Sequence, residues 1–579
     1  VYCRLHKTFT IATASLAACG QRSSGDGKPS GGTINYAITN PTSIDPFDIE
    51  EFNGAAVASQ LFDQLTIYDY DTQELKPCVA ESWEPSDEAA TWTFRIKKGL
   101  KFHDGSDVTA KSFQYAWNRL CDPKTTVAPS VVSYHLAMVK GYDDVVNGKA
   151  EELEGISCPD DYTLKVELDE PYADFPFVVS CTPLSPIPDC AKDNFDTYSK
   201  APVGNGPLQM DGTWNDGQYI NMTRYEGYVG DRTVKCDAVR FNIYKDTTTA
   251  FREFEAGNLD ICDIPTGRVK ETVEKYGQSD DGYTTSPEKQ SMVGEVLYTE
   301  YLAYNVNDSV LSDKRVRQAM SLAINRQNLC DTLYEGFAKP AGDIVPPGIK
   351  GNDETTWQYC GYDVDKANKL LDEAGYPAGS DGMRGIELTI MVASSNKTDE
   401  CEILQSDWKA VGINVTIDQK EYATMLDDYI AGNFQLGFRG WTADYPIMDN
   451  FLQPLMYTGV GDNVSHYSNA EFDAKLDEAR RTVDEDERIQ LMHEADAVAA
   501  EDMPIIADRI DRSALCGESA ASTPTNGIRI RRWCVRICGC VLPGGQRRPP
   551  LRVRTVPHWC VWVCTIVQRG RSRRSPSSR

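Results

Sequence analysis

The chain has 579 residues, an ordinary apolar fraction of 41% and a formal net charge of −27 at pH 7. This length allows several domains and a sizeable buried core. A body so rich in carboxylates repels phosphate backbones and anionic lipid head groups, which excludes nucleic acid as the expected partner. We expect most of the acidic side chains to form a solvated surface.

The N-terminal residues have the pattern of a bacterial lipoprotein signal. Arg4 and Lys7 precede an apolar run that ends in small residues before Cys19. The sequence therefore predicts a signal peptide over residues 1–18, lipid attachment at Cys19 and a flexible Gly/Ser-rich tether over residues 19–32. The alternative is a chance cysteine after an ordinary secretory signal. Later stretches fall short of the roughly 20 apolar residues of a membrane-spanning helix, so we expect membrane attachment by the lipid alone.

Alternating apolar residues in the first third of the chain predict half-buried strands. They are Trp92, Phe94 and Ile96 in one segment, and Tyr162, Leu164, Val166 and Leu168 in another. Between the two segments, Asp104-Gly105 predicts a turn, and residues 107–110 open a predicted helix that continues towards Trp117.

Helical spacing of apolar residues becomes regular in the second half. It predicts one helix over residues 316–324, with Ser312 as the capping residue, and another over residues 364–371. The second of these helices is expected to end at Gly375, which suits a C-cap.

The segments that follow predict a βαβ unit. A strand over residues 386–392, a helix over 403–411 and a strand over 413–417 imply parallel pairing and a right-handed crossover. Asp484 and Glu487 then have the spacing of a capping box for a last helix that runs to Met503-Pro504. The predicted class is α/β with mixed sheets.

Ten cysteines lie between residues 20 and 510, and none belongs to a CxxC pair or a cluster with histidines. A zinc site is therefore not expected, whereas some disulfides are expected in an oxidising compartment. The sequence does not say which cysteines pair. The ten are Cys78, Cys121, Cys158, Cys181, Cys190, Cys236, Cys262, Cys330, Cys360 and Cys401.

Residue usage changes abruptly near residue 511. Residues 511–579 hold 14 Arg, no Lys, two acidic residues and six Cys, whereas every Tyr and Phe lies before this point. We interpret this tail as the product of a reading-frame shift. The alternative is a genuine basic tail that binds an anionic cell wall.

Motifs of covalent or metal catalysis are missing from the sequence. It has no GxSxG nucleophile elbow, HExxH helix, Walker-type phosphate loop or EF-hand loop. His103-Asp104 lies at a predicted strand-to-turn junction, where a His–Asp contact commonly fixes the turn. We therefore predict a protein that is not an enzyme and that holds neither metal nor cofactor. A secreted hydrolase that uses His103 and Asp104 is the alternative.

One segment combines a carboxylate with aromatic residues. It follows the strand-like residues 434–438 and reads Arg439-Gly440-Trp441-Thr442-Ala443-Asp444-Tyr445-Pro446. Gly440 permits close approach of a backbone, and the Asp444 carboxylate lies between the apolar walls of Trp441 and Tyr445. Such a carboxylate suits an ammonium group through charge-assisted hydrogen bonds and cation–π attraction. The alternative is that Asp444 only holds a turn.

Seven segments together carry a family resemblance. They are SIDP at residues 43–46, PCVAESWE at 77–84, WTFR at 92–95, KFHDG at 101–105, PVGNGP at 202–207, VRQA at 316–319 and WTADYP at 441–446. In this order they resemble the oligopeptide- and dipeptide-binding proteins of bacterial ABC importers, extracellular solute-binding protein family 5, over roughly residues 33–510. The chain departs from the family at Asn205, where Thr is common, and in the tail from about residue 511.

The resemblance implies a two-lobed periplasmic-binding-protein-like fold with a hinged cleft and an extra third domain. The discontinuous first lobe would comprise residues 33–72, 200–285 and about 500–510. The extra domain would comprise residues 73–199, and the second lobe residues 286–499.

The resemblance also implies a set of ligand-binding residues. In peptide-binding members, the residue that matches Asp444, next to Tyr445, receives the α-ammonium group of an extended peptide. The chain around Gly440, Trp441 and Thr442 supplies strand-like contacts, as does the segment that contains Glu50 and Phe52. Relatives that bind nickel or sugars generally lack the Asp-Tyr pair. Arg439 lies near the position of a residue that would bind the peptide carboxylate.

These expectations combine into one functional hypothesis. A lipid-anchored, monomeric receptor on the extracytoplasmic face of the membrane would capture short peptides and deliver them to the permease subunits of an ABC transporter. The alternative is a family member that carries another solute, such as an oligosaccharide or a metal chelate.

Overall fold

The computed structural model describes residues 31–517, except residues 50, 70–71, 127, 193, 233, 235, 266, 283–284, 287 and 393–396. The predicted signal peptide, the lipidated Cys19, most of the tether and the tail beyond Gly517 lie outside these residues. Among the helices of the described part, none combines the length and the apolar character that crossing a membrane requires.

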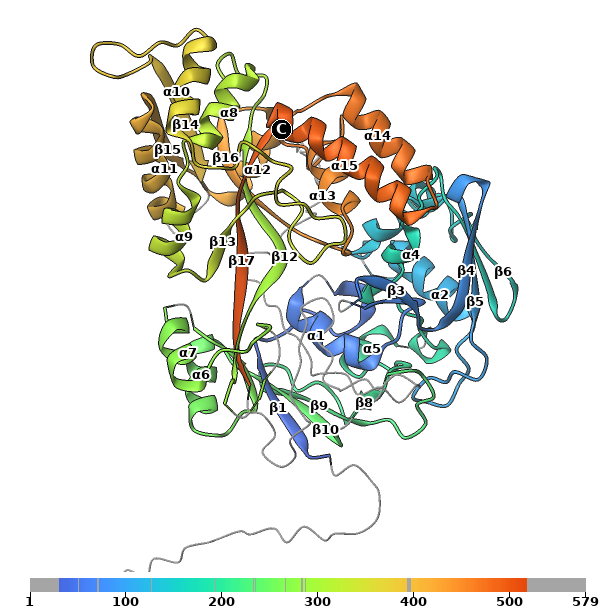
Figure 1. Cartoon of the computed structure of the whole chain (residues 1–579). Coiled ribbons are helices and arrows are strands. Elements are labelled where there is room, and N and C mark those ends of the chain that lie inside the picture. The colour runs from blue at the N-terminus through green and yellow to red at the C-terminus, as the bar shows by residue number, and fades with distance from the viewer. Residues whose placement is uncertain are drawn as a thin grey trace, which may run out of the picture.

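One large mixed sheet runs through the molecule (Figure 1). Its strands, in spatial order, are β15 (Ile413–Gln419), β14 (Ile386–Val392), β16 (Leu436–Thr442), β12 (Ser291–Tyr304), β17 (Ile505–Gly517), β11 (Ile261–Asp263), β1 (Thr33–Ile38), β10 (Ala238–Ile243), β9 (Tyr219–Arg224) and β8 (Leu208–Met210). The short β13 (Ala338–Pro340) pairs with β17 beside this path. Parallel and antiparallel pairs both occur, which confirms the predicted α/β class with mixed sheets.

Two long strands connect the halves of the molecule. β12 and β17 pair antiparallel from Ser291 opposite Cys516 to Ala303 opposite Ile505. At one end β17 pairs with β11, and at the other end β12 pairs with β16. The register shifts between Glu295 and Thr299, and a bulge of this kind bends and twists a ribbon. Figure 1 shows β12 and β17 passing together between the upper and the lower part of the fold.

The part below this ribbon in Figure 1, which we call the first lobe, is built on β1 and β8–β11. Its helices are α1 (Phe52–Leu61), α6 (Thr247–Glu255) and α7 (Val269–Tyr276). Its core contains Tyr36, Phe62, Ile220 and Phe241.

A second compact part, which we call the extra domain, has its own sheet in the order β4 (Ala80–Ser86), β5 (Thr91–Ile96), β7 (Thr163–Glu167) and β6 (Ile156–Asp160). The hairpin of β2 (Thr66–Asp69) and β3 (Glu74–Pro77) leads into it. Its helices are α2 (Ala110–Cys121), α3 (Tyr142–Val146), α4 (Phe175–Val178) and α5 (Phe195–Lys200). Both predicted strand segments and the predicted helix towards Trp117 are present, as β5, β7 and α2.

The upper part, which we call the second lobe, packs helices around β14, β15 and β16. The helices are α8 (Lys314–Leu322), α9 (Arg326–Tyr334), α10 (Val364–Glu373), α11 (Thr398–Ala410), α12 (Tyr422–Ala431), α13 (Asp449–Met456), α14 (Ala470–Arg481) and α15 (Glu485–Asp502). The predicted βαβ unit is confirmed, because β14 and β15 pair in parallel on either side of α11.

Two local details differ from the sequence predictions, and one agrees with them. The N-cap of α8 is Asp313 rather than Ser312, and its side chain accepts a hydrogen bond from Arg315 N. Asp484 caps α15 as predicted, by accepting from Glu487 N. β17 continues to Gly517, past the predicted boundary at residue 510, because residues 511–517 pair with β12, β13 and β11.

A buried ion pair joins the first lobe to the extra domain. Arg119 on α2 donates to both carboxylate oxygens of Asp45 at 2.8 and 2.6 Å, and both side chains are almost fully buried. The guanidinium group also lies against the rings of Phe47, Phe195 and Tyr198. This bidentate pair gives the SIDP segment its structural role.

The loss of this pair should destabilise the fold strongly. Replacement of Arg119 by Ala leaves the Asp45 carboxylate buried without its partner, so we expect the free energy of unfolding to fall by about 3–5 kcal/mol. Urea unfolding measures this change. Lys124→Ala is the matched control, because Lys124 and Glu151 form an exposed ion pair at 3.0 Å and its loss should leave the free energy of unfolding nearly unchanged. Equal effects of the two substitutions would contradict the prediction.

Candidate functional site

β16 leaves part of one edge without a partner strand. It pairs with β12 over its whole length, from Leu436 to Thr442, but with β14 only at Leu436 and Gly437. The N–H of Ala443 donates to Leu297 O at 2.9 Å, which places Ala443 in a hydrogen-bonded pair with β12. Backbone groups alternate between the two sides of an antiparallel strand. The N–H and C=O groups of Gly440 and Thr442 therefore point away from β12, along the edge beyond β14.

Two glycines of β16 lie against tyrosine rings. A Cβ atom on Gly437 would come within 2.0 Å of Tyr429 Oη, and a Cβ atom on Gly440 within 2.0 Å of Tyr298 Oη. The predicted close approach at Gly440 is thus made by Tyr298 of β12. Tyr298 Oη in turn donates to the carboxylate of Glu300.

The next two residues carry buried polar atoms that make no hydrogen bond to any described residue. Trp441 is 6% exposed, and its Nε1 is one of these atoms. Thr442 Oγ1 is the other. A buried donor or acceptor without a partner costs about 1–3 kcal/mol. Trp441 and Thr442 lie three and two residues before Asp444, and such atoms are suited to a polar ligand.

The Asp444 carboxylate is half-buried at the end of this segment. Oδ1 accepts from Tyr134 Oη of the extra domain at 3.1 Å, and Oδ2 accepts from Asn450 Nδ2 at 3.4 Å. Asn450 Oδ1 also accepts from Asp444 N at 2.7 Å, and Cys181 Sγ donates to Asp444 O at 3.4 Å. The extra domain and the second lobe therefore both hold this residue.

A histidine lies close to the carboxylate without forming an ion pair with it. Burial lowers the pKa of His135, although the charge of Asp444 opposes this effect. The ring of His135 lies tilted against that of Tyr134, with 4.2 Å between the centroids. A neutral imidazole at this position leaves the negative charge of Asp444 uncompensated.

Tyr445 belongs to a contact between the second lobe and the extra domain. Tyr172 Oη donates to Asp449 Oδ2 at 2.9 Å and to Tyr445 Oη at 3.4 Å. Asp449 also binds Arg480 at 3.0 Å. We call this group, together with the buried ion pair of Asp174 with Arg488 at 2.9 Å, the rim contact.

Arg439 is paired on the other face of β16. Its guanidinium group lies 3.2 Å from Asp462 and above the ring of Tyr429. Burial raises the pKa of Asp462, the Arg439 charge offsets part of this rise, and the Asp444 charge adds to it. Asp462 thus neutralises Arg439 close to the candidate site.

The face of β16 that carries Gly440 meets a buried cluster of charges. Arg509 of β17 contacts Glu400 at 2.5 Å and Glu300 at 3.4 Å. Lys397 contacts Glu300 at 2.7 Å and lies above the ring of Phe438. We call these residues the hinge cluster, because they join α11 to both strands of the β12–β17 ribbon.

Two of the predicted site residues, Glu50 and Phe52, belong to the first lobe. Phe52 is the first residue of α1 and packs against the first-lobe core, which contains no residue of β16. Glu51 caps the same helix by accepting from Asn53 N and Gly54 N. Glu50 lies outside the described residues. Gly440 and Thr442 lie on one face of β16 and Arg439 and Trp441 on the other, while Asp444 and Tyr445 follow the end of the strand.

His103 has a structural position far from this segment. Its Nδ1 accepts from Gly204 N at 3.1 Å, and its Nε2 donates to Gly206 O at 3.0 Å. Burial lowers the pKa of His103 to about 4. The expected His–Asp contact is wrong, because Asp104 instead accepts from Ser106 N and Oγ.

Asn205 lies in the same glycine-rich segment, and its side chain has a structural role. Its side-chain amide accepts from Asp63 N at 2.9 Å and donates to Asp63 O at 3.0 Å. The amide thus bonds both backbone groups of Asp63, as a neighbouring strand would.

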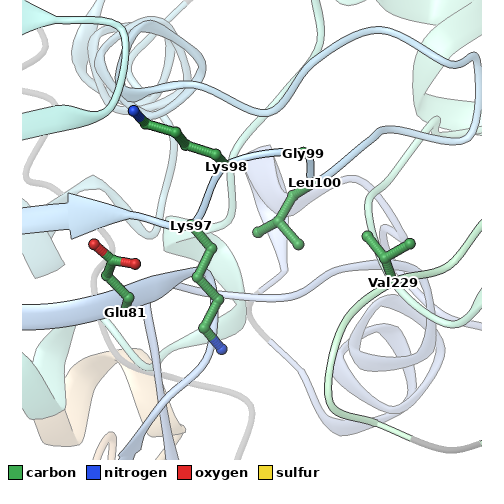
Figure 2. Close-up of a pocket in the computed structure, with 6 residues that line it drawn as sticks. All are labelled: Glu81, Lys97, Lys98, Gly99, Leu100 and Val229. Carbon is green, nitrogen blue, oxygen red and sulfur yellow. The ribbon is translucent and has the colours of Figure 1, made fainter.

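Two surface hollows lie away from the candidate site. One, of about 760 Å³, is lined by Glu81, Lys97, Lys98, Gly99, Leu100 and Val229 (Figure 2). In Figure 2 Lys98 points away from Leu100 and Val229, and Lys97 forms an ion pair with Asp231 at 2.7 Å. The other, of about 200 Å³, lies beside Thr389, Asp418 and Lys420. Neither is lined by a predicted ligand-binding residue, and the described residues form no group of three or more His, Cys, Asp or Glu suited to a metal ion.

Sequence reasoning missed the partners that the extra domain supplies. Tyr134 and Cys181 lie 310 and 263 positions from Asp444 and carry no local motif. Asn450 was also missed, although it lies only six residues after Asp444, because it belongs to the first turn of α13.

Comparison with known proteins decides the family. The model of bacterial extracellular solute-binding proteins, family 5, matches residues 74–463, which is well over half of the chain. The chain belongs to this family. Relatives of similar identity differ in their named solute. Heme-binding protein A of Haemophilus influenzae is 28% identical, with 87% of this chain and 93% of that protein covered.

Two further likenesses support the fold and the family. A dipeptide-binding protein of Bacillus subtilis is 27% identical, with 85% of this chain and 90% of that protein covered. A periplasmic murein tripeptide-binding protein in an unliganded open form matches with a TM-score of 0.73 at 24% identity, with 84% of this chain and 93% of that chain covered. This family 5 protein is thus a solute-binding protein with the two-lobed fold.

The packing at Gly440 leads to a prediction about the site. Gly440→Ala pushes the Tyr298 ring away from β16 and breaks its hydrogen bond to Glu300, so we expect the free energy of unfolding to fall by about 1–3 kcal/mol. Gly461→Ala is the control, because nothing lies within 4 Å of an added Cβ there. It should change stability by less than about 1 kcal/mol. Urea denaturation of both variants checks this, and an unchanged midpoint for Gly440→Ala would contradict it.

Proposed function

We propose that this family 5 protein captures short peptides between its lobes and delivers them to the permease of an ABC transporter. The observation that carries the proposal is that two features meet at the end of β16, an open strand edge and a carboxylate. An edge of backbone groups without a partner strand leads directly to a half-buried carboxylate. An extended peptide with a free α-ammonium group complements both features.

The ammonium group is proposed to bind Asp444. A carboxylate offers about four lone-pair positions, and Tyr134 and Asn450 occupy one each. Two positions remain for the N–H groups of an ammonium ion. The neutral His135 does not compete for the negative charge. Tyr445, which lies near the Asp444 charge, adds an apolar wall that limits access of water to the pair.

The peptide backbone is proposed to add as a strand beside Gly440 and Thr442. Main-chain hydrogen bonds of this kind supply affinity without reading the side chains of the peptide. The unsatisfied Trp441 Nε1 and Thr442 Oγ1 offer further polar contacts. Such a site selects for a peptide end and an extended backbone, whereas the sequence of the peptide matters little.

Capture is proposed to proceed by closure about the β12–β17 ribbon. The ribbon carries the covalent connection between the lobes, and the rim contact lies at the far side of the second lobe. A ligand that touches Asp444 of one lobe and the extra domain favours the closed arrangement through its contacts with both. No bond is made or broken in this cycle.

The cellular setting is proposed from the sequence. Cys19 would carry the lipid, and the acidic body would remain on the extracytoplasmic face of the membrane. Permease subunits of the importer would be the protein partner of a monomeric receptor.

A different solute is the second candidate, because one relative of comparable identity is named as a heme-binding protein. A free and an N-acetylated form of the same peptide distinguish the two proposals. Peptide binding through Asp444 requires the free ammonium group, so acetylation should abolish it, whereas a site for another solute would bind neither form.

Substitution of Asp444 tests the proposed ammonium site. Asp444→Asn removes the negative charge but keeps the shape, so we expect peptide affinity to fall by about 2–5 kcal/mol. Isothermal calorimetry with short peptides measures this loss. Glu151→Gln is the control, because Glu151 is 85% exposed and lies in the extra domain away from Tyr134. Unchanged affinity in a folded Asp444→Asn protein would exclude Asp444 from the site.

A further inference from the structure

Two cysteines from distant parts of the chain lie directly opposite each other. Cys262 of β11 and Cys516 of β17 form a cross-strand pair in an antiparallel ladder. The hydrogen bond from Ile264 N to Ala514 O, at 2.9 Å, fixes this register. Directly opposed residues in such ladders have Cα atoms about 4.5–5.5 Å apart, which lies within the range of about 4.4–6.8 Å found for disulfides.

The two side chains also share one buried environment. Both residues have no exposed surface, and both belong to a cluster with Phe251 and Phe254 of α6. Their side chains thus lie on the same face of the sheet, which is the face that α6 covers. On the β12 side, the residue opposite Cys516 is Ser291, so Cys262 is the thiol that faces Cys516 across this ladder.

We propose that Cys262 and Cys516 form a disulfide bond in the exported protein, which fastens the end of the hinge strand β17 to the first lobe. The sequence left the pairing of cysteines open, and this pair joins one of the ten cysteines of the body to one beyond residue 510. The proposal requires an oxidising compartment and does not depend on the nature of the solute.

The bond forms by thiol–disulfide exchange with an oxidised dithiol oxidoreductase. One thiolate attacks the disulfide of the oxidoreductase to give a mixed disulfide, and the second thiolate then displaces the oxidoreductase sulfur. Two thiols of this chain lose two electrons and two protons in total, and the oxidoreductase leaves with two thiols. Every atom and electron is thereby accounted for.

Burial of the two thiols determines the stage of folding at which this exchange takes place. It raises the pKa of the Cys262 thiol well above its usual value, and the neighbouring Cys516 adds to the effect. Because the thiolate is the attacking species, the folded core suppresses the reaction. Exchange therefore occurs before β11, β17 and α6 have packed, and the finished bond is then protected from reductants.

The bond would close a loop over residues 262–516, which contains the whole second lobe. Cross-links that close long loops restrict the unfolded chain most strongly. Reduction should therefore lower the melting temperature of the whole chain, and the change should vanish in a variant that lacks Cys262.

Peptide mapping of the full chain tests the proposal. The protein is exported to an oxidising compartment, denatured with an alkylating reagent and no reductant, digested, and analysed by mass spectrometry. We expect a linked peptide that contains Cys262 and Cys516, and its complete loss after reduction. Recovery of both residues as alkylated thiols, or of either one linked to a different cysteine, would overturn the proposal.

Two variants separate the bond from general effects on folding. In Cys262→Ala, Cys516 should become alkylated without reductant and the melting temperature should no longer respond to reductant. In Cys121→Ala, which removes a buried cysteine from the core of the extra domain, the linked peptide should persist. Protein that has been reduced in denaturant and refolded under reducing conditions should melt at a lower temperature than protein that was never reduced, and equal melting temperatures would count against the bond.

Discussion

The pairing of β12 with β17 is the constraint on which the rest of the structure depends. These strands carry the chain between the lobes, and the sheets of both lobes are extensions of their two ends. The bulge between Glu295 and Thr299 divides the ribbon into two stretches. On one side of it β17 pairs with β11, and on the other side β12 pairs with β16. Immediately above it, the hinge cluster ties β12 and β17 to α11 through Arg509, Glu300 and Glu400.

The candidate site follows from this arrangement. β16 is held to β12 along its full length, so the outward groups of Gly440 and Thr442 and the carboxylate of Asp444 have fixed positions. The Asp444 carboxylate lies at the contact of the second lobe with the extra domain. Tyr134 and Asn450 satisfy only part of its hydrogen-bonding capacity. A cation that completes this shell would stabilise the contact between the second lobe and the extra domain.

The sequence predicted the parts of the site that are local and missed those that depend on long-range packing. The Asp444 segment and the βαβ unit are visible because their spacing and alternation are local signals. Tyr134 and Cys181 reach Asp444 only after the extra domain has packed on the second lobe, and no periodicity encodes that contact. His103 shows the same limit, since a local partner, Asp104, was expected, whereas the partners are Gly204 and Gly206, a hundred residues away. The end of β17 was misplaced at residue 510 because unusual composition concealed a strand that tertiary pairing supports.

The most direct test of the central claim is a crystal structure of the protein with a bound short peptide. The account predicts that the α-ammonium nitrogen lies about 2.7–3.2 Å from the Asp444 carboxylate and that the peptide backbone runs beside Gly440 and Thr442. An ammonium group bound elsewhere, or a solute that is not a peptide in its place, would contradict the account.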